Sequence, residues 1–173
     1  MTTRLGRRAK RWWDILHLGS GVGWFGVALC QLVLNIISRT TADAGVRVAA
    51  HKIGHTLDIW LLIPLVLLAL VSGVVLAWRS NWGVFRHWWI VVKLVATILL
   101  MVFSAIWLGG WIGAAVELAP AQGPAYFEVR NKLLGGSIFN NVSILLMVVI
   151  SVFKPWGRIR QVTPDWKAAR TGR

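Results

Sequence analysis

Two histidines lie where both could bind one haem iron. His17 sits about one turn inside a long apolar segment, and His87 directly precedes the first residues of another. Neutral imidazoles are axial ligands of haem iron in many proteins. Ionisable side chains at membrane depth are costly, which makes them functional candidates by default. The pair predicts a haem b site that serves electron transfer or sensing.

Basic side chains close to these histidines fit the propionates of a haem. Arg86 adjoins His87, Lys93 follows within the same apolar segment, and Arg11 precedes His17 by six positions. A simpler alternative assigns His17 to a neighbouring backbone carbonyl and His87 to the wet membrane surface. Lys93 could also extend its charge to the interface or form an ion pair with Asp14.

A second cluster favours a divalent metal. His51, His55 and Asp58 are spaced so that they share one face of a helix. Two imidazoles and a carboxylate are suitable ligands for Zn²⁺, Cu²⁺ or Fe²⁺. Glu117 or Glu128, from a different connection, could complete the site. The competing interpretation is a pair of solvated histidines at the membrane surface.

Glycines and asparagines inside the apolar segments predict helix contacts. The stretch from Gly21 to Gly26 matches a dinucleotide-binding glycine pattern, but that pattern works only between a strand and a helix. Gly19, Gly23 and Gly26 instead line one side of a helix, where a neighbouring backbone or a flat cofactor could approach closely. Asn140 and Asn141 are expected to form interhelical hydrogen bonds.

The elements that position these residues follow from composition. Apolar residues make up 57% of the 173 residues and charged residues only 14%. The apolar residues gather in four uncharged runs, and about 20 such residues cross a bilayer as a helix. We predict an all-α, polytopic membrane protein with four transmembrane helices and exclude a soluble domain. The expected spans are 12–37, 57–78, 88–112 and 134–153.

The connections between the spans predict an up-and-down bundle. The first connection, 39–50, and the third, 113–136, lie at one end, and 126–134 within the third could form an interfacial helix. Pro64 is expected to kink the second span, because it removes one backbone hydrogen bond. Since Cys30 is the only cysteine, no internal disulfide can form. No nucleophile and base are suitably spaced, so a hydrolytic enzyme is disfavoured.

The net charge of +13 is unevenly distributed. Most of the 19 Lys and Arg residues lie in the tails, 1–11 and 154–173, and around the connection between the second and third spans. Short segments rich in Lys and Arg stay in the cytoplasm. Both tails are therefore predicted to be cytoplasmic and to bind anionic lipids, whereas nucleic-acid binding is not expected.

Two stretches resemble a family of small four-helix integral membrane proteins of actinobacteria. The first is 16–26, LHLGSGVGWFG, and the second runs from 62–75 into 82–94, WGVFRHWWIVVKL. The family typically shows an HxxSSVGWxG-like first helix and a WGLFRHYWVxxKL-like start of the third. The resemblance implies a bacterial plasma membrane and places His17, Arg86, His87 and Lys93 in the family pattern. The family lends no function, and the outer cluster of His51, His55 and Asp58 is not part of its pattern.

Three functions stay open at this stage. A haem-binding electron-transfer or sensing protein would use His17 and His87. A transporter or metal-handling protein would use His51, His55 and Asp58. A non-catalytic subunit of a larger membrane complex, or a homo-oligomer, would use the basic tails and the small-residue faces. An enzymatic activity is not expected.

Overall fold

The computed structural model describes residues 6–79, 87–157 and 159, and this part of the chain contains helices but no strands. Four continuous helical rods are long and apolar enough to cross a membrane. The first is α1 (Arg7–Thr40), and the second consists of α2 (Ala44–Leu57), η1 (Asp58–Leu62) and α3 (Ile63–Arg79). The third consists of α4 (Trp88–Phe103), η2 (Ser104–Leu108) and α5 (Gly109–Leu118), and α6 (Pro124–Phe153) is the fourth. The all-helical prediction with four membrane-length helices is confirmed.

Local sequence explains where the helices begin and end. Asp43 caps α2, because its Oδ1 accepts hydrogen bonds from the backbone N–H groups of Gly45 and Val46 at 2.6 and 3.1 Å. Pro124 opens α6 at a position where a missing N–H costs nothing. Lys154 ends α6 in the left-handed conformation, with φ of 47°, and Pro155 follows it.

The helices extend well beyond the predicted spans. α1 has 34 residues, which corresponds to about 50 Å, whereas the hydrocarbon core is about 30 Å thick. Helix also covers most of the expected connections 39–50 and 113–136, because only Thr41–Asp43 and Ala119–Gly123 are non-helical at that end. The stretch 126–134 is helical and forms the continuous beginning of α6, while its place at the membrane interface stays a prediction.

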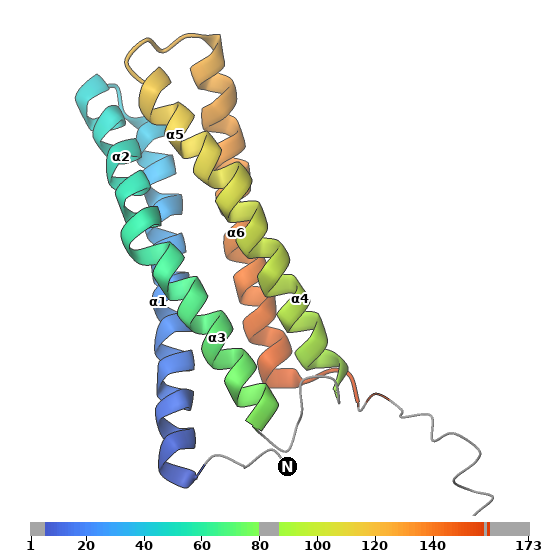
Figure 1. Ribbon diagram of the computed structural model, residues 1–173. Coiled ribbons are helices and arrows are strands. Elements are labelled where there is room, and N and C mark those ends of the chain that lie inside the picture. Colours follow the sequence, from blue (N-terminus) through green and yellow to red (C-terminus); the bar gives the residue numbers. More distant parts are fainter. Residues whose placement is uncertain (1–5, 80–86, 158, 160–173) are drawn as a thin grey trace, which may run out of the picture.

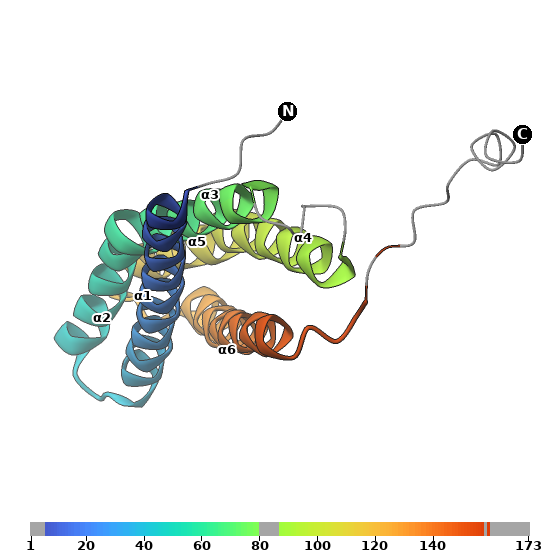
Figure 2. The same cartoon turned by 90° about the horizontal axis from the view of Figure 1, so that it is seen from below.

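The four rods are arranged as a ring in which each packs mainly against two others (Figure 1). α1 packs against α2, α3 and α6, while α6 also packs against α4 and α5. In the view along the bundle, α1 lies between α2 and α6 (Figure 2). The described ends of α1 and α6 that lead to the tails lie at the same end of the bundle as the end of α3 and the start of α4 (Figure 1).

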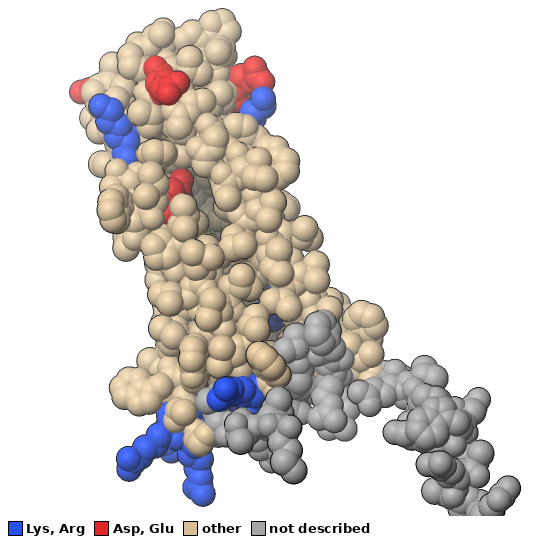
Figure 3. All heavy atoms as spheres, viewed as in Figure 1, with Lys and Arg blue, Asp and Glu red and all other residues tan. Residues whose placement is uncertain are grey.

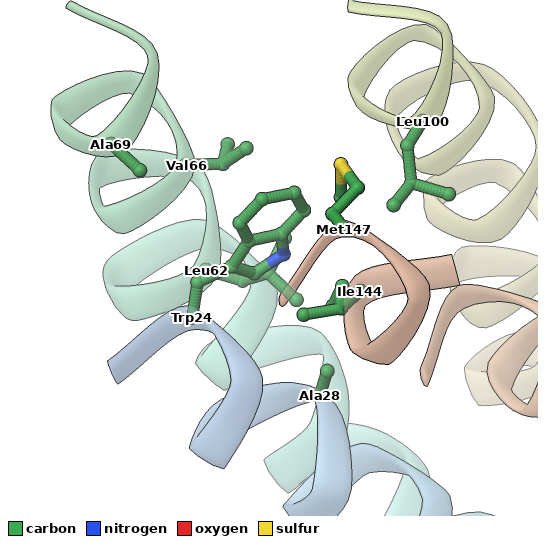
Figure 4. Close-up of a cluster of buried hydrophobic side chains, with 8 residues drawn as sticks. All are labelled: Trp24, Ala28, Leu62, Val66, Ala69, Leu100, Ile144 and Met147. Carbon is green, nitrogen blue, oxygen red and sulfur yellow. The ribbon is translucent and has the colours of Figure 1, made fainter. Parts of the chain in front are cut away.

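A small core joins the helices at mid-length (Figure 4). Trp24 and Ala28 of α1 meet Leu62 and Val66 of the second rod. Residues from α4 and α6 close the cluster, and Figure 4 shows the Trp24 indole reaching between Val66 and Met147. Most large apolar side chains instead face outward, and a chain that exposes so much apolar surface is suited to a lipid environment.

Candidate ligand-binding cavity

A cavity of about 340 Å³ lies between the helices at the level of the two π-helical segments, η1 and η2. Every one of the four rods contributes to its wall. Figure 3 shows a recess in this part of the surface, with acidic atoms at its edge. Its size falls near the lower end of ordinary small-molecule sites. The apolar lining consists mainly of Trp24, Ala28, Ile59, Leu62, Ile63, Val66, Leu67, Met101, Ala105, Leu108, Ile112 and Leu133.

The π-helical segments place polar side chains in this wall. In η1 the N–H of Ile63 donates to the carbonyl of Asp58, five residues earlier, directly before Pro64. The predicted disturbance at Pro64 therefore takes the form of a wide helical turn, a form that is frequent at functional sites. η2 has the same pattern between Gly109 and Ser104. Asp58 and Ser104 thus both line the cavity.

Among the described residues that line the cavity, Asp58 is the only acidic one. Its Oδ1 accepts a hydrogen bond of 2.7 Å from Nε2 of Gln31, whose same nitrogen also donates to the carbonyl of Gly54 at 2.7 Å. Within the described chain no Lys, Arg or His forms an ion pair with Asp58. The carboxylate therefore borders an apolar space with one amide as its partner, and His55 lines the same wall.

The remaining polar groups of the wall bond to one another across helices. Nδ2 of Asn35 donates to Oγ of Ser137 at 2.7 Å, which joins α1 to α6. Ser104 and Asn140 approach at 3.5 Å, a weak contact between η2 and α6. The interhelical role predicted for Asn140 and Asn141 is found, since Nδ2 of Asn141 also donates to the carbonyl of Ala28 at 3.0 Å.

One donor in the cavity wall is unused. Trp24 is buried, and its indole Nε1 has no hydrogen-bond partner among the described residues. An unpaired buried donor costs about 1–3 kcal/mol. The N–H of Trp24 is thus available to an acceptor in the cavity.

The outer histidine cluster is divided between two places. His51 is buried, and its Nε2 lies 3.0 Å from the hydroxyl of Tyr126 on α6. His55 and Asp58 line the cavity, but His51 does not. Across the described residues, no three His, Cys, Asp or Glu side chains are grouped as metal ligands. Glu117 is exposed on α5, and Glu128 pairs with Lys132 on α6. The metal site remains a prediction.

The inner histidines belong to another part of the bundle. Nδ1 of His17 lies 3.0 Å from the carbonyl of Ala69 and 3.1 Å from Oγ of Ser72, both on α3. This is the carbonyl contact that the simpler alternative anticipated. His87 caps α4 and is buried rather than solvated, with 6% of its surface exposed. Neither residue lines the cavity.

The basic residues expected beside a haem are differently engaged. Lys93 donates to Oγ of Ser151 on α6, and Asp14 pairs with Lys10 at 2.7 Å, so the expected Asp14–Lys93 pair is absent from the described structure. Arg86 lies outside the described residues. Arg11 is exposed at the start of α1. The haem site therefore also remains a prediction.

Sequence reasoning missed the residues that build the cavity. Gln31 and Asn35 are one helical turn apart on α1, and two amides at that spacing in an apolar run were the available signal. The close approach of α1 and α2 uses Gly54, where an added Cβ would lie 2.8 Å from Oε1 of Gln31. Of the predicted glycine face, Gly23 packs against Leu65, but Gly19 and Gly26 face open space.

No protein-family model, no curated protein and no solved structure matches this chain. The resemblance to actinobacterial four-helix membrane proteins therefore stays a prediction. The candidate site rests on its own geometry.

Proposed function

We propose that this protein is a multi-pass protein of a bacterial plasma membrane that binds a small organic cation in the cavity, as a carrier or transporter does. Both termini are cytoplasmic in this proposal, and the four rods form an up-and-down bundle. Of the functions that the sequence left open, this one belongs to the transporter class. The observation that carries it is the placement of Asp58, a carboxylate at the edge of the second expected span that faces an apolar cavity.

The electrostatic situation of Asp58 favours a cationic ligand. A carboxylate at membrane depth is costly, and a single amide donor such as Gln31 offsets only part of that cost. A cation bound in the cavity would offset more of it. The ring of Trp24 in the same wall adds a surface that attracts cations, and the apolar lining suits the hydrocarbon part of the ligand.

An organic cation fits the wall better than a divalent metal. Zinc and similar ions take three or four strong protein ligands. The cavity offers His55 and Asp58, and its other polar groups are amides and hydroxyls already bonded across helices. His51, the third residue of the predicted metal set, is engaged with Tyr126.

The test uses a matched pair of probes, benzyltrimethylammonium and its neutral carbon isostere 2,2-dimethylpropylbenzene. Binding to the purified protein in dodecyl maltoside is measured by calorimetry and by thermal stabilisation. We expect Asp58→Asn to weaken binding of the cation about tenfold while leaving the neutral probe unaffected, since about 1.4 kcal/mol of charge attraction is lost.

Glu117→Gln is the matched control, because it removes one carboxylate that is exposed outside the cavity. It should leave the affinity for both probes unchanged. Equal binding of the cation by the wild type and Asp58→Asn would contradict the proposal.

A further inference from the structure

A second group of buried polar residues lies beyond the cavity, where α2 and α6 meet the connection after α1. Arg47 sits in the first turn of α2, and Arg130 in the second turn of α6. Between them are His51 and Tyr126, whose rings meet edge to face with centroids 5.8 Å apart. None of these four residues lines the cavity.

Both arginines have donors without acceptors. Arg47 is only 7% exposed; one of its terminal nitrogens, Nη2, donates to the carbonyl of Thr41 at 2.9 Å. Its other terminal nitrogen, Nη1, is buried without a partner in the described structure, and so is Nε of Arg130. The guanidinium of Arg130 is held by aromatic rings, 5.0 Å from the centroid of Phe127 and 5.7 Å from that of Tyr126.

The two positive charges act on the same place and lack a negative partner. Arg47 and Arg130 both exert their charge on His51 and on Tyr126. Neither arginine takes part in an ion pair with a described residue. The nearby acids are committed elsewhere: Asp43 caps α2, and Glu128 pairs with Lys132 at 2.6 Å. Guanidinium groups always carry a positive charge. Two of them therefore lie in the same region without a negatively charged partner among the described residues.

We propose that Arg47 and Arg130 form a binding site for a phosphate group at this end of the bundle. Guanidinium groups recognise phosphate oxygens through paired N–H donors, and an anion between them would satisfy the unused nitrogens and cancel the repulsion of the two charges. Both residues lie outside the expected spans 57–78 and 134–153, on the side where lipid headgroups and the aqueous phase are expected. The phosphate is therefore supplied either by a lipid headgroup or by free phosphate.

Access to the site runs past Arg130. Its guanidinium forms no hydrogen bond with the described residues and lies near the rings of Tyr126 and Phe127. It can therefore turn toward an entering anion without breaking a hydrogen bond. Arg47 stays fixed by Thr41 and forms the rigid side of the site.

The test measures thermal stability of the full chain in dodecyl maltoside, a detergent without phosphate. One arm adds sodium phosphate against sodium chloride at equal ionic strength. The other adds dioctanoyl phosphatidylglycerol against dioctanoylglycerol. Stabilisation by inorganic phosphate identifies a soluble anion as the ligand, and stabilisation by phosphatidylglycerol alone identifies a headgroup; either result supports the site.

Arg130→Gln should raise the half-saturating concentration of the effective ligand about tenfold, the loss expected for charge-assisted hydrogen bonds. Arg47→Lys keeps the charge but loses the paired donors, so it should also weaken binding. Because the charge is kept, this variant tests the site even if a neutral variant fails to fold. Lys52→Gln removes one exposed charge from the same helix and should leave binding unchanged. The proposal is overturned if neither ligand stabilises the wild type above its control, or if folded Arg130→Gln responds as the wild type does.

Discussion

A single glycine decides how closely two helices approach at the cavity. A Cβ at Gly54 would lie 2.8 Å from Oε1 of Gln31 and 2.9 Å from Cδ1 of Ile112. Real Cβ atoms do not come so near, so either the amide or the isoleucine would have to move. Because Gln31 also holds Asp58, the position of the carboxylate depends on a residue that carries no side chain.

We expect Gly54→Ala to lower the free energy of unfolding by about 1–3 kcal/mol, the usual cost of overpacking. The measurement is unfolding of the purified protein in detergent, followed by circular dichroism. Gly26→Ala is the matched control on α1, since a Cβ there meets nothing within 4 Å. It should be neutral or slightly stabilising, because alanine favours the helix. A Gly54→Ala variant as stable as the wild type would show that the contact relaxes freely.

The haem hypothesis is also tested at single residues. It predicts that protein produced with ample haem shows a Soret band and a sharp reduced α-band, and that His17→Ala and His87→Ala each abolish this low-spin spectrum. His55→Ala is the control histidine, because it lies at the cavity instead. Colourless protein under these conditions would end the hypothesis and leave His17 with its bonds to α3 as a structural residue.

At the scale of elements, apolar runs predict the four rods well and their interruptions poorly. Hydropathy identifies spans because a run of about 20 apolar residues has few other uses. It does not show how far α2 extends before the second span, since Arg47 and His51 are polar residues that become buried only through tertiary packing, as His51 does against Tyr126 of α6. Pro64 signals the disturbance in the second rod, but η2 contains no proline and no comparable signal.

The candidate site was predictable only in part, because tertiary packing decides which residues meet there. Asp58 and His55 stand out as ionisable residues near an apolar run, and both line the cavity. Their true partners come from elements far away in the sequence, as Gln31 does for Asp58. Helical spacing within one segment therefore grouped His51 with them, although tertiary packing turns it toward Tyr126.

The contact between α1 and α6 can be measured as an interaction of two elements. Asn35 and Ser137 form a buried hydrogen bond of 2.7 Å. A double-mutant cycle with Asn35→Ala, Ser137→Ala and the double variant should give a coupling free energy of about 0.6 kcal/mol, and at most about 1.7 kcal/mol. Unfolding in detergent provides the four values. The same cycle on Asn35 and Ser143 serves as the control, and a coupling equally large there would refute a specific bond.

At the scale of the whole molecule, the two ends of the bundle differ in their balance of charge. On the face drawn in Figure 3, the lower end shows Lys and Arg without acidic atoms, whereas the upper half shows acidic atoms together with Lys and Arg. The described chain ends that lead to both tails lie at the lower end. Under the rule that basic segments remain in the cytoplasm, that end is expected to face inward.

The expected orientation is tested with reporter fusions in a bacterial host. Alkaline phosphatase joined after Arg173 should be inactive and a fluorescent protein there should be bright, because the C-terminus is expected in the cytoplasm. Phosphatase inserted at Gln122, in the turn between α5 and α6, should be active. A bright fluorescent protein at Arg173 together with inactive phosphatase at Gln122 would contradict the number of crossings, and an active phosphatase at Arg173 would contradict the orientation.

The pairing of α1 with α6 implies a delay during biosynthesis between the synthesis of α1 and the formation of its contacts with α6. Asn35 and Ser137 are 102 residues apart, so the amide of Asn35 leaves the ribosome long before its partner exists. At 5–20 residues per second the delay is roughly 5–20 s. During that interval the polar groups of α1 must be shielded by the translocation machinery or by water. The bundle can be completed only when α6, its last helix, has been inserted. α1, although synthesised first, therefore completes its contacts last.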